Sequence, residues 1–205
     1  NVTVKESPEW FKSRLKACGL RSINNIVDIS NYVMLELGMP LHIFDRDLIS
    51  GSEVLIKKCE TDEIFKTLDD IDRKLIVGDT VIADSAGTLV LAGIMGGKKS
   101  GVSEATKNIF IEVANWKAAM VRRTSTRLGL RTDSSQRFEK TLDSQLTERT
   151  LLRTLELVLE ICPEAKVVGK AQYAGSSLEE IKPLVIKTSL SKTYSIVIFS
   201  PVARA

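Results

Sequence analysis

The feature that most restricts the fold of this 205-residue chain is a block of short β-branched segments between residues 52 and 112, with helical patterns on both sides. The segments are EVLIKKC, TVIADSAG, TLVLAGIMGG and NIFIEVA, separated by Gly, Asp or Ser turns. Such runs between turn residues are typical of strands, and TLDDIDRKL within the block predicts a hairpin. Because helices flank a block of mainly antiparallel strands, the sequence predicts an α+β fold.

Two helices are predicted before the strands. The first begins at a Ser7 cap, has Pro8 in its first turn and ends at Gly19. The second covers about residues 25–37 and is stopped by Gly38, and Pro40 prevents its resumption. The side chains expected in the core are Trp10, Phe11, Leu15 and Cys18 from the first helix, and Ile26, Ile29, Val33 and Leu37 from the second.

Two further helices are predicted after the strands. Asn115 is expected to cap a helix that continues to about Leu128, before Gly129. A longer amphipathic helix is expected over about residues 143–162, and its predicted inward residues are Leu146, Leu151, Leu155, Val158 and Leu159. VVGKAQYAG (167–175) predicts a final strand, and LVIKTSLSKTYSIVIF (184–199) predicts one or two more.

Composition excludes several classes of protein. A net charge of +3, from 29 basic and 26 acidic residues, does not mark the whole chain as a nucleic-acid binder. The three cysteines form no CxxC, which excludes a zinc ribbon and fits the reducing cytoplasm. No apolar stretch approaches the ~18 residues needed to cross a membrane. The polar N-terminus lacks a signal peptide and an initiator Met, so we expect a fragment of a longer chain.

The single histidine, His42, lies in the first of two candidate segments for chemistry, RSINNIVDISNYVMLELGMPLHIFD (21–45). The usual zinc sites need several His or Cys ligands, so no metal site is expected. Its interleaved polar residues either line a pocket or belong to a capped amphipathic helix, with His42 in a loop. In the second segment, LAGIMGGKKSG (91–101), Gly93, Gly96 and Gly97 allow the backbone to approach a ligand, although glycines here more often form turns or bulges between strands.

Two more segments carry charge in unusual places. Glu112 ends the apolar strand NIFIE, where it must be exposed, paired or turned into a polar pocket, and strand alternation favours solvent as the simple explanation. RRTSTRLGLRTDSSQRFEK (122–140) concentrates basic residues, which suits phosphate recognition but also suits a solvated helix face. These basic residues are Arg122, Arg123, Arg127, Arg131, Arg137 and Lys140.

These four segments, in this order, resemble the beta subunit of bacterial phenylalanyl-tRNA synthetase. The matching strings are RSINNIVDISNYVMLELGMPLHIFD, VIADSAGTLVLAGIMGGKKSGVSEATKNIFIEVANW and RRTSTRLGLRTDSSQRFEK, and the likeness covers about residues 7–175. It corresponds to the central editing module of that subunit, which implies a three-layer α+β unit built around a β-sandwich. Residues 1–175 are thus expected to form the editing module and residues 176–205 an unplaced extension.

The resemblance implies an ester hydrolase within an aminoacyl-tRNA ligase, which removes tyrosine wrongly attached to tRNA(Phe). It implies a cytoplasmic α2β2 heterotetramer with the alpha subunit and tRNA(Phe) as partners, and ATP and Mg²⁺ as cofactors of the parent enzyme but none in this fragment. Carried over residue by residue, it gives three groups of site residues. They are His42, Asn31 and Thr132 for catalysis; Glu112, Gly96, Ser134, Ser30 and Arg21 for substrate binding; and Arg122, Arg123, Arg127 and Arg131 for contact with tRNA.

The chain departs from the family at a few of these positions. Ser30 stands where the family usually has Thr, Ser134 stands where it often has Ala, and FEKTLD replaces the common FERGVD. Two alternative functions remain open. One is a non-catalytic tRNA-docking or subunit-assembly module with a lapsed editing pocket, and the other is a free-standing deacylase acting in trans.

Overall fold

The computed structural model describes residues 1–51 and 53–175, and all helices and strands described here lie within one compact unit, Asn1–Gly169. The helices are α1 (Glu9–Ala17), α2 (Asn25–Leu37), α3 (Ala118–Leu128), α4 (Asp133–Phe138) and α5 (Leu146–Ile161). The strands are β1 (His42–Asp45), β2 (Leu55–Lys58), β3 (Glu63–Lys66), β4 (Asp72–Leu75), β5 (Thr80–Asp84), β6 (Gly87–Leu91), β7 (Met95–Gly96) and β8 (Ile109–Glu112). The α+β class is confirmed.

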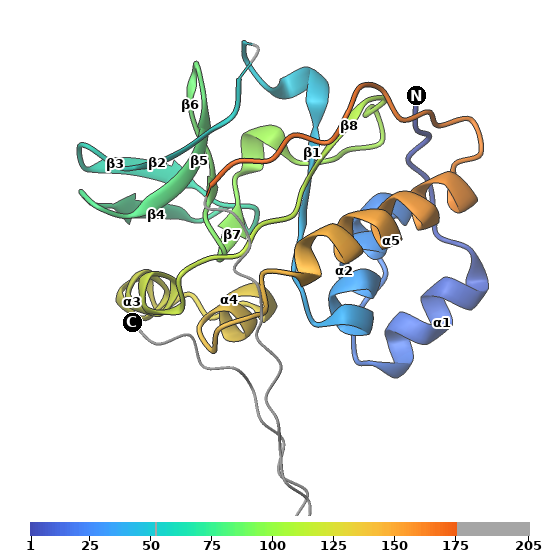
Figure 1. Cartoon of the computed structure of the whole chain (residues 1–205), viewed down its shortest axis with the longest axis horizontal. Coiled ribbons are helices and arrows are strands. Elements are labelled where there is room, and N and C mark those ends of the chain that lie inside the picture. Colours follow the sequence, from blue (N-terminus) through green and yellow to red (C-terminus); the bar gives the residue numbers. More distant parts are fainter. Residues whose placement is uncertain (52, 176–205) are drawn as a thin grey trace, which may run out of the picture. The chain divides into compact units, whose positions relative to one another are not determined.

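The strands form three small antiparallel sheets. Their orders are β1-β8, β2-β5-β6-β7 and β3-β4, and an isolated bridge between Thr67 and Gly97 ties the β3–β4 turn to the residue after β7. Strands β2–β7 gather on one side of the unit, α1, α2 and α5 pack together on the other with β1 and β8 between them, and α3 and α4 lie below β2–β7 in Figure 1. One apolar core lies among α1, α2 and α5, and a second lies between the strands and α3 and α4.

Helix α2 forms where the sequence predicts it. The Asn24 side chain accepts hydrogen bonds from the backbone N–H groups of Ile26 and Val27, which have no partner inside the helix. Gly38 ends the helix at φ 78°, a left-handed conformation that glycine adopts without a Cβ clash. The predicted inward residues Ile26, Ile29 and Val33 are fully buried, and Leu37 packs at the edge of the core.

The predicted cap of α1 is wrong. The helix begins after Pro8 without a side-chain cap, because the Ser7 hydroxyl instead donates to Asp28 Oδ2 at 2.6 Å. Phe11 and Leu15 are fully buried, but Trp10 is 41% exposed and Cys18 is exposed. Trp10 is covered instead by the guanidinium of Arg14, 5.1 Å from the ring centroid.

Three predictions after the strands also need correction. Asn115 does not cap α3, because its amide nitrogen donates to the carbonyl of Leu142 at 2.8 Å and the helix begins at Ala118. Helix α5 buries Thr150, Thr154, Leu157, Val158 and Ile161, whereas Leu159 is 42% exposed. Within 167–175 no strand forms, and the predicted strands of 184–199 lie outside the described residues. Among the described residues, no helix has the length and apolarity required to cross a membrane.

Candidate active site

A cavity of about 360 Å³ lies between the α2 side and the strand side of the unit. Helix α2, the start of β1, the β3–β4 turn, the β6–β7 region, the end of β8 and the start of α4 all contribute to its lining. Of the residues that the resemblance places around a site, this lining includes Ser30, Asn31, His42, Gly96, Glu112, Thr132 and Ser134. Segments separated by about 100 positions in the sequence therefore converge on one cavity.

The helical repeat explains the α2 wall. Val27, Ser30, Asn31 and Met34 all line the cavity, and the spacing i, i+3, i+4, i+7 puts them on one stripe of the helix. The stripe that carries Ile26, Ile29 and Val33 faces the core instead. Ser30 turns its hydroxyl proton back to the carbonyl of Val27 at 2.7 Å, so its methylene side faces the cavity more than its donor does.

His42 and Glu112 lie directly opposite each other in the β1–β8 pair. Facing residues of an antiparallel pair project to the same side of the sheet, and here that side is the cavity. The Nε2 atom of His42 and the Oε1 atom of Glu112 are both buried, and neither has a hydrogen-bond partner among the described residues. Unpartnered buried polar atoms are rare in folded proteins, so two in one cavity indicate a site prepared for a polar ligand.

Burial changes the ionisation of both side chains. Loss of water raises the pKa of Glu112 to about 7 and lowers the pKa of His42 to about 4. His42 is therefore a neutral imidazole near pH 7, and Glu112 is close to its midpoint. The pair provides hydrogen-bonding groups inside an apolar wall, with no fixed ion pair between them.

Gly96 allows the His42 ring to reach this position. A Cβ atom at Gly96 would lie 2.4 Å from His42 Cε1 and 3.0 Å from His42 Nε2. Any larger residue would thus push the imidazole away from the cavity wall. The glycine that the sequence leaves open as a turn residue has a packing reason of its own.

The Thr132 hydroxyl is already occupied. It donates to the carbonyl of Ile94 at 2.8 Å and accepts from the Ser135 N–H at 3.0 Å, as the N-cap of α4. The Ser135 hydroxyl lies 2.9 Å from the backbone nitrogen of Thr132, which completes a capping box. This geometry favours a positioning role for Thr132, because its proton is committed to the backbone.

The remaining predicted residues lie outside the cavity lining. Arg21 is exposed in the segment that precedes α2. Arg127 forms an ion pair with buried Asp79 and donates to the Lys74 carbonyl at 3.1 Å, so it holds α3 to the strands. Arg131 pairs with Glu139 at 2.9 Å.

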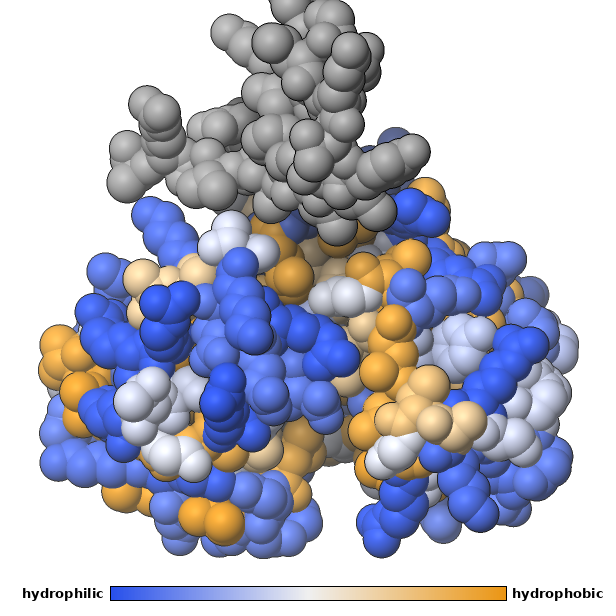
Figure 2. Space-filling view, turned by 90° about the horizontal axis from the view of Figure 1, so that it is seen from below, coloured by the Kyte–Doolittle hydropathy of each residue, from blue (hydrophilic) through white to orange (hydrophobic). Residues whose placement is uncertain are grey.

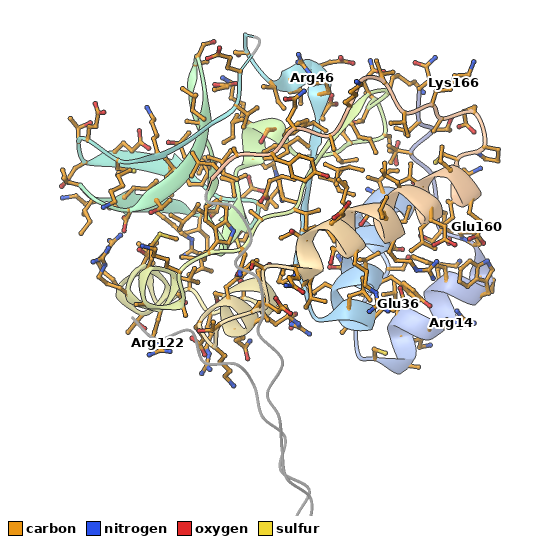
Figure 3. All side chains as sticks on the ribbon, in the orientation of Figure 1. Arg14, Glu36, Arg46, Arg122, Glu160 and Lys166 are labelled. Carbon is orange, nitrogen blue, oxygen red and sulfur yellow. The ribbon has the colours of Figure 1, made fainter. Side chains whose placement is uncertain are left out.

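Two arginines of α3 point outward. Arg122 projects from α3 (Figure 3) and donates to the backbone carbonyl of Glu139 at 2.6 Å, while Arg123 is exposed. The face of the molecule seen from below, which includes α3 and α4, is mostly hydrophilic with smaller hydrophobic patches (Figure 2). Surface-directed guanidinium groups on such a face suit contact with a polyanion.

Part of the apolar lining carries no site prediction from the sequence. Leu68, Met34, Trp116 and Phe138 all line the cavity, and none of them was assigned to a site. The sequence could have predicted Met34, because it lies three positions after Asn31 and so on the same face of α2. Leu68 lies in the hairpin that TLDDIDRKL predicts, and no local pattern shows which other segment that turn meets.

Comparisons with known proteins place this geometry in context. A family model described as the B3/4 domain matches residues 1–163. The chain is 46% identical over 198 residues to the phenylalanine--tRNA ligase beta subunit of Porphyromonas gingivalis, which covers 96% of this chain and 24% of that protein. It is 46% identical over 169 residues to the same subunit of Solibacter usitatus, covering 82% of this chain and 22% of that protein. The chain spans about a quarter of the length of these curated relatives.

Proposed function

The chain belongs to the B3/4 domain family, and from this premise we propose that its cavity hydrolyses tyrosine wrongly attached to tRNA(Phe). In this proposal the chain is a portion of a phenylalanine--tRNA ligase beta subunit, with the alpha subunit and tRNA(Phe) as partners in the cytoplasm. ATP and Mg²⁺ belong in this proposal to aminoacylation by the parent enzyme and have no part in the cavity.

The observation that carries the proposal is the buried Oε1 of Glu112, which has no hydrogen-bond partner among the described residues and lies in a cavity with many apolar lining residues. Tyrosine and phenylalanine differ by one hydroxyl group. The tyrosine hydroxyl can donate a hydrogen bond to this oxygen. When phenylalanine is bound, the carboxyl group loses water and gains no partner, which costs about 1–3 kcal/mol. A site of this kind prefers tyrosine, whereas an apolar synthetic site discriminates poorly against an added hydroxyl.

The other residues have proposed roles that follow from their positions. Gly96 lets the His42 ring lie close against the wall, which keeps the cavity beside it open for the aromatic ring. Asn31 and neutral His42 orient the ester and a water molecule. Water adds to the ester carbonyl, the bond to the ribose oxygen breaks, and the products are free tyrosine and tRNA with its terminal hydroxyl restored. Orientation and the neighbouring ribose hydroxyl help this step without a covalent nucleophile on the protein.

The direct test is incubation of mischarged Tyr-tRNA(Phe) with the 205-residue chain and with a complete α2β2 enzyme that contains it. We expect release of tyrosine faster than from buffer alone and faster than release of phenylalanine from Phe-tRNA(Phe). Binding of tRNA without hydrolysis by either preparation would favour the alternative function, a docking or assembly module. The sequence leaves that alternative open, and the retained His42, Glu112 and Thr132 speak against it.

A further inference from the structure

The turn between β3 and β4 forms a wall of the cavity, although its residues belong to a separate two-stranded sheet. Leu68, at the tip of this turn, lines the cavity and donates its backbone N–H to the carbonyl of Gly96 at 3.0 Å. A Cβ at Gly96 would lie 3.0 Å from Leu68 Cδ1, and one at Gly101 would lie 3.2 Å from Cδ2. The two Leu68 methyl groups thus rest on two glycines that flank the cavity.

Leu68 nevertheless leaves 44% of its surface exposed. Two other lining residues, His42 and Glu112, in contrast hold polar atoms that are fully buried. A large apolar side chain that is half covered by the cavity rim has free surface for a ligand that enters beside it. Ile71 in the same turn is similarly exposed, at 50%, but does not line the cavity.

The turn is held by a hydrogen-bond network around the fully buried Thr67. The Thr67 hydroxyl lies 2.5 Å from Asp69 Oδ1 and 3.0 Å from the Ile71 carbonyl, and it accepts from Arg73 Nε at 3.0 Å. Arg73 also binds Asp69 through an ion pair of 2.6 Å. One hydroxyl group therefore connects both ends of the three-residue loop to the strand that follows.

The position of the loop is also fixed from the side of the cavity. Asp70 adopts φ 63°, which fits the left-handed residue that closes a three-residue hairpin loop. Its carboxylate pairs with Lys98 at 2.6 Å, directly after the strand that carries Gly96. The buried Thr67 network and the backbone hydrogen bond from Leu68 to Gly96 hold Leu68 against Gly96, and the exposed Asp70–Lys98 pair adds little to this.

We propose that Thr67 is a positioning residue of the site, whose hydroxyl fixes the β3–β4 turn so that Leu68 packs against the bound aminoacyl ester. This inference rests on the proposed function, since it names the ester as the ligand that Leu68 meets. Loss of the hydroxyl frees the turn, and the ester then loses one apolar wall. Thr67 itself touches no reacting atom.

The experiment compares four variants of the full chain: Thr67→Val, Thr67→Ser, Leu68→Ala and Ile71→Ala. The probe is 3′-(L-tyrosyl)amino-3′-deoxyadenosine, an amide that the site cannot hydrolyse as an ester, and its dissociation constant is measured by calorimetry. We expect Thr67→Val and Leu68→Ala to weaken binding by roughly tenfold, since one hydrogen bond or one apolar contact has about this value. Thr67→Ser restores most of the affinity, and Ile71→Ala stays within about twofold of wild type.

A second readout separates positioning from general destabilisation. Amide hydrogen exchange of Leu68, whose N–H binds Gly96, should accelerate in Thr67→Val while exchange in α2 stays unchanged. On Tyr-tRNA(Phe) the same variant should raise KM with little change in kcat. Equal affinity for Thr67→Val and Thr67→Ser, or an equal loss in Ile71→Ala, overturns the inference. A wild-type chain that binds the amide but hydrolyses no ester contradicts the proposed function instead, and the exchange data still test Thr67.

Discussion

The molecule buries carboxylates in two contrasting ways. Asp28 lies in the first turn of α2 and is fully buried. It accepts hydrogen bonds from the hydroxyls of Ser7 and Ser22 and from the Ile23 N–H. Asp79, at the start of β5, accepts from the Ile76 N–H at 3.0 Å, from the Thr124 hydroxyl at 2.8 Å and from Arg127. Glu112 has a buried oxygen with no partner among the described residues.

The difference shows which carboxylates serve the fold and which is kept for a ligand. A buried carboxylate with donors on every side connects distant segments, as Asp28 joins the N-terminal segment to α2 and Asp79 joins β5 to α3. A buried carboxyl group without donors gives the fold no such benefit, and its burial raises its pKa. Substitutions at the two kinds of site should therefore act with opposite sign on stability.

The largest loss of stability is expected from Asp28→Ala. Removing the carboxylate leaves the buried Ser7 hydroxyl and the partly buried Ser22 hydroxyl and Ile23 N–H without their acceptor. We expect the free energy of unfolding to fall by about 4 kcal/mol, measured by urea denaturation. The matched control is Asp72→Ala, which removes an exposed ion pair with Lys66 and should cost less than about 1 kcal/mol. Equal losses in the two variants would remove the distinction drawn here.

The next largest effect is expected from Arg127→Ala on α3. This change leaves Asp79 buried without its cation, and we expect a loss of about 3 kcal/mol in the free energy of unfolding. Arg123→Ala on the same helix lies in solvent and should stay within about 0.5 kcal/mol.

Charge reversal at Arg123 and Arg127 then separates structure from tRNA contact. Arg123→Glu should lower the affinity for tRNA and its dependence on salt without unfolding the chain. If affinity and salt dependence stay unchanged in Arg123→Glu, the proposed contact of α3 with tRNA is wrong. Any loss in Arg127→Glu should be accompanied by a lower thermal midpoint.

Unlike the preceding substitutions, Glu112→Gln should raise the free energy of unfolding, and the gain should grow with pH. Burial raises the pKa of Glu112 from 4.5 to about 7, so the folded state binds the proton more tightly than the unfolded state. The wild-type chain therefore loses stability from this group as the pH rises through 4.5–7, and Glu112→Gln does not. We expect Glu112→Gln to gain about 3 kcal/mol in free energy of unfolding relative to wild type between pH 4.5 and pH 8, measured by denaturation at both pH values.

His42 adds the reverse trend, which the same experiment resolves. Burial lowers its pKa from 6.5 to about 4, so stability from this group is lost as the pH falls from 6.5 to 4. Because Glu112→Gln keeps His42, the stability of this variant should still fall on the acid side. A flat difference between wild type and Glu112→Gln across pH 4.5–8 contradicts the burial of the carboxyl group.

The smallest effect is expected from Thr132→Val. The variant loses the N-cap of α4 and the bond to Ile94, which should lower the free energy of unfolding by about 1 kcal/mol. Thr132→Ser keeps both bonds and should restore most of it. Loss of hydrolysis in Thr132→Ser as large as in Thr132→Val would instead point to a role for the threonine methyl group.

Local signals in the sequence predict α2 well, because Gly38 and the stripe of Ile26, Ile29 and Val33 agree with one another. The predicted α5 face was wrong at Leu159, which is 42% exposed, whereas Val158 is buried as predicted. The buried side also includes the polar Thr150 and Thr154, which the prediction left out. Hydrophobic periodicity does not predict a helix that hides threonines. Tertiary contacts likewise decided Ser7, which serves Asp28 across 21 positions rather than its own helix.

The site was predictable only in part. The family resemblance led to His42, Gly96 and Glu112, whereas composition and spacing left each of them with an ordinary structural explanation. Alternation along NIFIE suggests that Glu112 faces solvent, and only the pairing of β8 with β1 turns it toward the cavity. The β3–β4 turn illustrates the same limit, since the contact of Leu68 with Gly96 joins two sheets that no local pattern connects.

The most direct test of the role of Glu112 is single-turnover deacylation of Tyr-tRNA(Phe) and Phe-tRNA(Phe) by wild type, Glu112→Gln and Glu112→Ala. The neutral amide still accepts a hydrogen bond from the phenol, but without charge assistance, which roughly halves the strength of the bond. It also leaves no buried charge unpaired beside phenylalanine. We expect the ratio of kcat/KM for tyrosyl over phenylalanyl ester to fall in Glu112→Gln and further in Glu112→Ala, because hydrolysis of the tyrosyl ester slows while that of the phenylalanyl ester is kept or rises. An unchanged ratio together with a collapsed rate on both esters would contradict recognition of the phenol and assign Glu112 to general-base catalysis.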